Sequence, residues 1–388
     1  GENLADPGAY SARVIANLDG GDLGGLAGRE FYLWNTVVVG DPVGPESGYS
    51  KVYEGKGLVQ SSVHRYFVNV PAGATAMRVR LEVSEDTGSS RGARVMTEIC
   101  NPEGHVRGGW GGYAGVDEHP IRDQVVLAPE LYPGTWEIDV ASSIGAMDKS
   151  DYRLSVSFDG YTFTPDTVTD LGREKNGADA TANVTVTRSF AGVFKGDATV
   201  AIEGFTATEE VEITKADEYT RDFTLDSTTP RAAFHLVMSE KVGNLFTDCA
   251  VNILDSKGKA VRVNGFDGLE ADVGISLPAG AETATFTLQV VGAFALAADM
   301  EEWGFDLEEK YFFAHPVQGQ ASRAGGGPLR LYCGVPTEVE LSFTDEWQAA
   351  PADMGTFGAI RFNDTRTDDR RPGDEGGRLV LEIPIRLE

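Results

Sequence analysis

The sequence predicts an all-β protein with two jelly-roll-type β-sandwiches, an additional small β unit and one short inserted helix. Three observations support this fold class. Apolar residues make up 41% of the 388 residues, which is enough to fill hydrophobic cores. Apolar and polar residues alternate with a period of two in many short segments. The 47 glycines, many of them adjacent, indicate turns between short strands.

The alternating segments are separated by turn signals, so in order they predict the strands of a sandwich or barrel. Each segment has one apolar face to bury. The clearest of them are Val68–Val70, Met77–Val83, Trp136–Val140 and Tyr152–Phe158. The turn signals between them are Pro71-Ala72-Gly73, Pro133-Gly134 and Asp159-Gly160.

These patterns divide the chain into five parts. We expect strands continuing from an upstream domain (1–45), a first sandwich (46–160), an intermediate β unit (161–228, with 375–388), a second sandwich (229–347) and a polar loop (348–374). The chain starts in mid-pattern and with Gly1, so we interpret it as a processed piece of a larger protein. A weak internal repeat relates Ser61–Asp159 to Arg231–Phe343. Duplication explains this repeat, and so does a coincidence of ordinary β patterns.

Three further segments complete the expected fold. Ala293–Leu307 predicts a short helix, because its apolar residues fall mostly at helical spacings. Thr162–Ser227 is rich in Thr and Val and predicts a third β unit rather than a linker. Asn363–Gly377 has no apolar residue and predicts a solvated loop. The last strand, Leu379–Leu387, then needs a partner, and we expect it to pair with the Thr162–Ser227 unit.

The composition excludes several classes of partner. The formal charge of -27 would repel nucleic acid and disfavours an anionic membrane surface. No stretch is apolar enough to predict a membrane span. Solubility is the simplest reason for so much negative charge, and attraction of cationic substrates or of calcium is the alternative. The three cysteines, Cys100, Cys249 and Cys333, show no metal-binding spacing, so we expect three buried thiols, with one disulfide as the alternative.

The sequence contains two strings that resemble catalytic motifs, but neither has the neighbouring segments that its chemistry requires. Asp86 begins an Asp-Thr-Gly segment, but no matching histidine and serine segments accompany it. Ser90 lies in a Gly-x-Ser-x-Gly string, but a strand rather than a helix is predicted to follow. The five histidines are scattered, and no acidic cluster has the spacing of an EF-hand loop. We therefore predict no catalytic residue, no metal ligand and no cofactor, with a calcium ion held by loop carboxylates as the alternative.

Four aromatic residues are candidates for an interaction surface. Trp110 and Tyr113 lie in the glycine-rich segment 108–115, where exposed rings could stack on sugars or contact a partner protein. Trp303 and Phe305 lie on the predicted helix. For both pairs the alternative is packing against a core, and for Trp303 and Phe305 it is the favoured one.

The order of several motifs resembles the region downstream of the protease domain in tripeptidyl peptidase II-like serine peptidases of the subtilisin family. The first stretch departs from the usual form at Trp34-Asn35-Thr36. The stretches that carry the resemblance are Ser11–Val14 with Arg29–Val39, His64–Thr75, Ala250–Gly258 and Leu277–Gly280 with the helix before Phe312. The first module is also similar to bacterial pre-peptidase C-terminal domains, through Asn101–Gly104 and Pro133–Trp136.

The resemblance implies a non-catalytic accessory or assembly region of a peptidase, because the family's catalytic residues lie upstream of it. Its expected partners are an upstream peptidase domain, further copies of itself in a homo-oligomer, and a peptide. The alternative hypothesis is a carbohydrate- or cell-surface-binding module of a secreted protein, in which Trp110 and Tyr113 would contact a glycan. An extracellular or cell-surface location is favoured over a cytoplasmic one.

Overall fold

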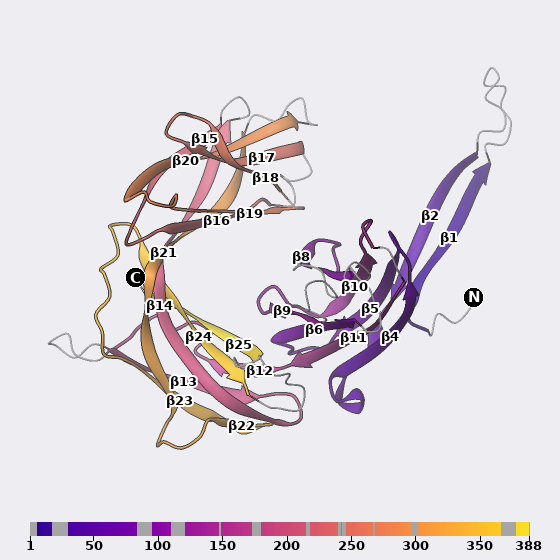
Figure 1. Ribbon diagram of the computed structural model, residues 1–388, viewed down its shortest axis with the longest axis horizontal. Helices are drawn as coiled ribbons and strands as arrows, with labels where there is room; N and C mark the ends of the chain where they lie inside the picture. The colour runs from indigo at the N-terminus through magenta and orange to yellow at the C-terminus, as the bar shows by residue number, and fades with distance from the viewer. Residues whose placement is uncertain are drawn as a thin grey trace. The chain divides into compact units, whose positions relative to one another are not determined.

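The computed structural model describes residues 6–17, 30–83, 95–109, 121–146, 149–172, 180–214, 218–239, 242, 246–266, 268–295, 302–365 and 378–387. β-strands make up nearly all of its regular structure, which confirms the predicted all-β fold class (Figure 1). The chain forms two compact units. The first contains Gly1–Tyr161 and Ser189–Ala191, and the second contains Thr162–Arg188 and Gly192–Glu388.

The first unit contains a hairpin and a sandwich of two sheets. The hairpin pairs β1 (Gly8–Asn17) with β2 (Glu30–Val39). One sheet has the order β3-β5-β10-β7-β8, with β3 (Asp41–Pro42), β5 (Val63–Val70), β10 (Gly134–Ser142), β7 (Val95–Cys100) and β8 (Val106–Gly109). The other has the order β4-β11-β6-β9, with β4 (Ser50–Leu58), β11 (Ser150–Asp159), β6 (Ala76–Val83) and β9 (Ile121–Leu127). All pairs are antiparallel except β3 with β5.

The core of this sandwich lies between the inward faces of the two sheets. Alternate residues of β10, among them Trp136 and Ile138, have no solvent exposure. They belong to the same cluster as Leu154 and Val156 of β11, which are also fully buried. The alternation predicted for both segments therefore describes strands with one buried face.

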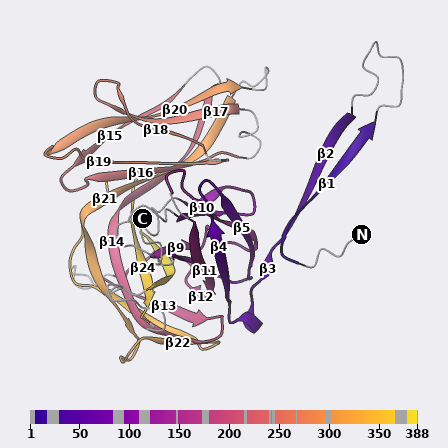
Figure 2. The same cartoon turned by 45° about the vertical axis from the view of Figure 1, so that its right-hand side comes forward.

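The second unit is built on two strands of 22 residues, β14 (Val193–Thr214) and β21 (Glu302–Arg323). They pair antiparallel along most of their length and run through the whole unit (Figures 1 and 2). They belong to a ten-stranded sheet with the path β12-β13-β23-β21-β14-β24-β25, in which β16 pairs with β21 and β19, and β22 pairs with β14. A four-stranded sheet has the order β15-β20-β17-β18.

The other strands of the ten-stranded sheet are β12 (Tyr161–Thr164), β13 (Ala180–Arg188), β16 (Arg231–Val237), β19 (Glu270–Ser276), β22 (Arg330–Tyr332), β23 (Thr337–Phe343), β24 (Gly355–Asp364) and β25 (Arg378–Leu387). Those of the four-stranded sheet are β15 (Tyr219–Asp226), β17 (Phe246–Asp255), β18 (Ala260–Gly265) and β20 (Thr283–Ala295). A parallel bridge between Val168 and Ile385 joins β25 to the segment after β12, so the large sheet is nearly closed on itself.

The four-stranded sheet packs on the part of the large sheet that contains β16 and β19. Their shared core includes Phe234 of β16 and Phe286 of β20, which are 1% and 4% exposed. Phe223 of β15 packs against both rings, with centroids 4.8 and 5.7 Å away. The ends of β14 and β21 close this core through Val211 and Leu307.

The helix predicted for Ala293–Leu307 is wrong in the described residues. Its beginning belongs to β20 and its end to β21, while residues 296–301 lie outside the described chain. Trp303, Phe305 and Leu307 alternate with polar residues and are all buried, so they line one face of a strand. Apolar residues spaced by three or four indicate a helix, and those spaced by two or four indicate a strand. A short segment that contains both kinds of spacing fits either structure.

The polar loop expected at 348–374 is not continuous: residues 348–354 form no strand, as predicted, but β24 occupies Gly355–Asp364. Its residues Phe357, Ile360 and Phe362 are buried and supply the apolar face that a strand needs. The rest of the loop, from residue 366, lies outside the described residues. The last strand, β25, pairs with β24, which in turn pairs with β14. The expected pairing of the last strand with the 162–227 segment is therefore indirect. β25 reaches β14 through β24, and it contacts the start of the segment through the single bridge at Val168 rather than along a whole strand.

The cysteines differ from expectation at one position. Cys100 and Cys249 are buried, as predicted, but Cys333 is exposed. Cys333 directly follows β22, in an isolated parallel bridge with Arg188 and next to the turn at Gly334, and the residues at such a turn lie at the surface because their backbone polar groups need water. None of the three forms a disulfide.

Candidate binding site

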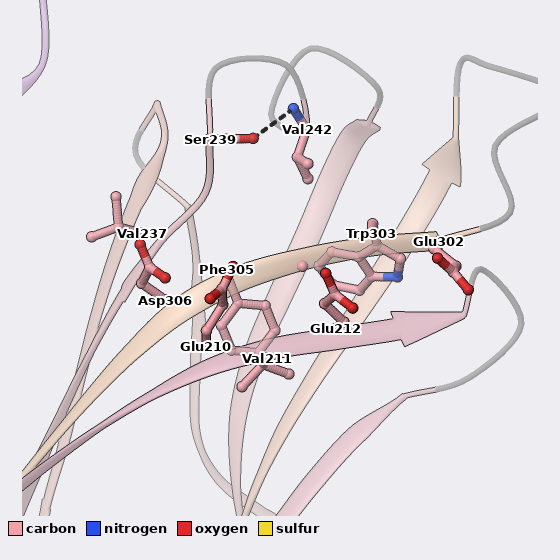
Figure 3. A pocket seen from close by; sticks show the side chains of 11 residues that line it. Glu210, Val211, Glu212, Val237, Ser239, Val242, Glu302, Trp303, Phe305 and Asp306 are labelled. Atoms are coloured by element: carbon pink, nitrogen blue, oxygen red, sulfur yellow. Dashed lines mark hydrogen bonds between the residues drawn. The ribbon is translucent and has the colours of Figure 1, made fainter.

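A hollow of about 320 Å³ opens on the second unit, where the end of β14, the start of β21 and the end of β16 lie together (Figure 3). The pleat of a strand sends alternate side chains to opposite faces. Trp303 and Phe305 point into the core and are each 3% exposed, so Glu302 and Asp306 belong to the opposite face. Residues of both faces of the strand pair border the hollow, since Val211, Trp303 and Phe305 belong to its lining together with the acidic residues.

Gly304 lies in the middle of this polar face. It is the register partner of Glu212, and Asp306 is the partner of Glu210. Gly304 lies between Glu302 and Asp306 on β21, and all three border the hollow. A Cβ atom at Gly304 would lie well inside contact distance of the Val211 carbonyl oxygen, so the backbone approach requires glycine.

The charge of the hollow is negative. Four carboxylates line it, those of Glu210, Glu212, Glu302 and Asp306, and its lining includes no Lys, Arg or His (Figure 3). Carboxylates so placed attract ammonium and guanidinium groups, and the rest of this acidic chain adds to the field. Among the described residues, no group of three or more acidic, His or Cys side chains is arranged to hold a metal ion.

The described basic side chains near this region are engaged elsewhere. Arg221 of β15 forms ion pairs with Glu209 at 2.5 Å and with Glu309 at 2.7 Å. Lys310 and Arg386 both pair with Glu308, at 2.8 and 2.6 Å.

A second, larger hollow of about 820 Å³ lies where β24 begins and β25 ends. Hydroxyl groups dominate its lining, which includes Thr167, Thr169, Thr206, Thr208 and Thr356. The Thr206 side chain is buried, and its hydroxyl has no hydrogen-bond partner among the described residues. Threonine hydroxyls both donate and accept hydrogen bonds, so this hollow suits a polar ligand such as a peptide backbone.

The first unit holds a different charged group, on the outward face of its five-stranded sheet. Asp139 of β10 has Arg65 of β5 and Glu98 of β7 as register partners. Burial, followed by the neighbouring Glu137 carboxylate, raises the pKa of Asp139 to about 7. Burial acts to raise the pKa of Glu137, but hydrogen bonds from Arg65 and Asp139 and the positive charge of Arg65 together outweigh it, so the pKa is lowered. The two carboxyls therefore differ in protonation near neutral pH.

The sequence-predicted residues are not gathered at one site. Trp303 and Phe305 border the acidic hollow, but their rings pack in the core, 5.9 Å apart, and Tyr219 contacts Phe305. Core packing was the favoured interpretation for this pair. Trp110 and Tyr113 lie outside the described residues, so the glycan hypothesis built on them stays a prediction. Asp86 and Ser90 also lie outside them.

The sequence analysis did not single out Glu210 and Glu212. The signal that could have found them is the run Thr208-Glu209-Glu210-Val211-Glu212, in which acids occupy the polar positions of an alternating strand. Their partner Gly304 is distant in sequence, so only the strand register brings it opposite Glu212.

The sequence matches no protein-family model and no curated protein. Among solved structures, the fold is similar to the crystal structure of tripeptidyl peptidase 2 (TPP II), with a TM-score of 0.51 and 13% sequence identity. That match covers 99% of this chain and 33% of the TPP II chain, so the chain spans about a third of its length.

Two other solved structures match less well. One contains the M60 catalytic domain with two CBM51 domains of Clostridium perfringens ZmpB, at 9% identity and a TM-score of 0.20, covering 80% of this chain and 42% of that one. The other is PNGase F, a glycosylasparaginase from Flavobacterium meningosepticum, at 8% identity and a TM-score of 0.23, covering 69% and 99%. The similarity to TPP II is a similarity of fold. It supports the fold, and not the function, that the resemblance in the sequence implies.

Proposed function

We propose that the chain is a non-catalytic accessory and assembly region of a subtilisin-like serine peptidase of the tripeptidyl peptidase II type. In this role it shapes access to an active site located elsewhere or holds copies of the peptidase together. One observation supports the proposal: the similarity in fold to the TPP II structure covers 99% of this chain, and therefore residues of both units. Sandwich modules are common, but a likeness that extends over two dissimilar units is more specific than a likeness to either unit alone.

A fluorophosphonate probe, which labels activated serines, tests the absence of catalysis in this chain. We expect no labelling of the isolated chain, and we expect the full product of its gene to be labelled at a serine outside residues 1–388. Labelling of a serine within the chain, Ser90 above all, contradicts the proposal. Failure of the full gene product to label contradicts the peptidase context.

The assembly role has a separate test. The full gene product is compared with a form that lacks the two units, by native mass spectrometry and by hydrolysis of a short and a long peptide substrate. We expect the shortened form either to lose its oligomeric state or to change the ratio of the two hydrolysis rates. An unchanged mass distribution and an unchanged ratio would exclude both accessory roles.

A further inference from the structure

β14 has two neighbours along its first part and one along its last part. β21 pairs with it from Thr199 to Thr214. On the other side β24 pairs with it only as far as Thr206, whose partner is Gly355, the first residue of β24. From Ala207 to Ile213, within the described part of the chain, β14 has no strand partner on that side and no backbone hydrogen bond that leads there. We call Ala207–Ile213 the open edge.

The side chains of the open edge confirm that it reaches solvent. Thr208, Glu209 and Glu210 are exposed one after another, whereas a strand inside a sheet would alternate. Alternate backbone N–H and C=O groups of such an edge have no partner in the sheet and can pair with another chain. The edge is therefore a template for one more strand.

Room for that strand exists where β24 begins. The threonine-lined hollow is bordered by Ala207 and Thr208 of the open edge and by Asp353 and Gly355 at the start of β24. It thus lies in line with β24, at the position that a continuing strand would occupy. Its hydroxyl groups can bond a peptide backbone that enters there.

The charge around the open edge indicates which kind of polypeptide segment could pair with it. Glu210 and Glu212 form no ion pair with a described Lys or Arg, and the acidic hollow adds Glu302 and Asp306 beside them. A second copy of this chain would bring the same acids against them and a charge of -27 against -27, so self-pairing is disfavoured. A segment with Lys or Arg at alternate positions would face these carboxylates while its backbone pairs with β14.

We propose that the open edge of β14 binds an extended basic segment of another polypeptide, which adds to the large sheet in line with β24. The acidic hollow then takes one of its cationic side chains, and the threonine-lined hollow takes its backbone. This inference rests on the second unit alone and stands whether or not the chain belongs to a peptidase.

Fluorescence anisotropy of a labelled peptide tests the proposal with the whole chain. The probe alternates lysine and valine over the length of Ala207–Ile213, and a matched peptide carries glutamate in place of lysine. We expect the lysine peptide to bind and the glutamate peptide not to bind, with affinity falling as salt is raised because the contact is partly electrostatic. Equal binding of both peptides, or binding of neither, overturns the proposal.

A second measurement distinguishes strand addition from mere charge attraction. Two versions of the lysine peptide carry N-methyl groups on alternate amides, one version on the even positions and the other on the odd. An added strand directs alternate N–H groups toward its neighbour, so one version should lose binding by at least about tenfold and the other should keep it. Equal affinity of the two versions contradicts strand addition.

Charge-reversal variants locate the site. Glu210→Lys with Glu212→Lys should weaken binding of the lysine peptide by at least about tenfold. Glu338→Lys with Glu340→Lys, on two exposed positions of β23, serves as the control of equal charge change and should have little effect. Circular dichroism and thermal melting show that both variants are folded. Equal losses in the two variants, or dimerisation of the wild-type chain through this edge in ultracentrifugation, contradict the proposal.

Discussion

Glu212 on β14 and Gly304 on β21 are register partners, and both border the acidic hollow. The same glycine lets the two backbones approach more closely than any other residue would, since a Cβ atom would collide with the Val211 carbonyl. The close packing of the strand pair beside the acidic hollow therefore depends on this one glycine.

Gly304→Ala should lower the free energy of unfolding by about 1–3 kcal/mol, because the strand pair must move apart to admit a methyl group. Gly265→Ala on β18 is the control, since its Cβ would meet the Cys249 carbonyl oxygen at an ordinary 3.6 Å. Urea unfolding followed by circular dichroism measures both. Similar stability of the two variants would show that the close approach is not needed.

The raised pKa of Asp139 makes the first unit more stable in mild acid. The folded chain binds a proton at this carboxyl up to about pH 7, whereas the unfolded chain loses it near its ordinary value of 3.8. The free energy of unfolding should therefore rise as pH falls from 8 toward 5.5, and the gain ends below about pH 4.

Asp139→Asn should remove that pH dependence, and its stability at pH 8 should exceed that of the wild type by on the order of 2 kcal/mol. Chemical unfolding at pH 5.5 and pH 8 measures the free energy of unfolding of both proteins. Groups other than Asp139 titrate in both, so their effects cancel when the variant is compared with the wild type. A variant as pH-dependent as the wild type would show that the Asp139 carboxyl is already ionised at pH 5.5.

The sequence predicts those strands of this protein that have one clean buried face. Trp136–Val140 shows a period of two without interruption, and it forms β10. Ala293–Leu307 predicts a helix wrongly, because Met300, Trp303 and Leu307 fall at helical spacings. Those spacings hide the alternation of Trp303, Phe305 and Leu307. Local spacing carries no information about which neighbour a segment will pair with, and here that neighbour is β14.

The candidate site depends still more on pairing than the fold does. Glu212 faces Gly304 only because the β14–β21 ladder has this register, which shifts by a bulge between Ile202 and Gly204. The open edge exists because β24 starts at Gly355, after a turn at residues 352–353, and composition alone does not show that the strand begins there. Neither feature has a motif, so neither could be read from one sequence.

Cys333 should be the one fast-reacting thiol of the native chain. It is exposed, while Cys100 and Cys249 are buried and burial raises the pKa of Cys100 to about 11. Brief treatment with a maleimide followed by mass spectrometry should add one label to the wild type and none to Cys333→Ser. Three labels added at equal rates would mean that the buried positions open readily.

The buried hydroxyl of Thr206 contributes nothing to stability and should be replaceable. It has no hydrogen-bond partner among the described residues, and a buried polar group without one is costly. Thr206→Val keeps the shape of the side chain, so the free energy of unfolding should stay the same or rise by up to about 1 kcal/mol.

Thr97→Val is the matched comparison for Thr206→Val, because Thr97 is also buried but donates a hydrogen bond of 3.1 Å to Gln124. That substitution should lower the free energy of unfolding by about 1 kcal/mol, the usual net value of one such bond. Urea unfolding of the two variants side by side measures the contrast. If Thr206→Val is as destabilising as Thr97→Val, the Thr206 hydroxyl has a partner in solution, and an ordered water in the threonine-lined hollow is the first candidate.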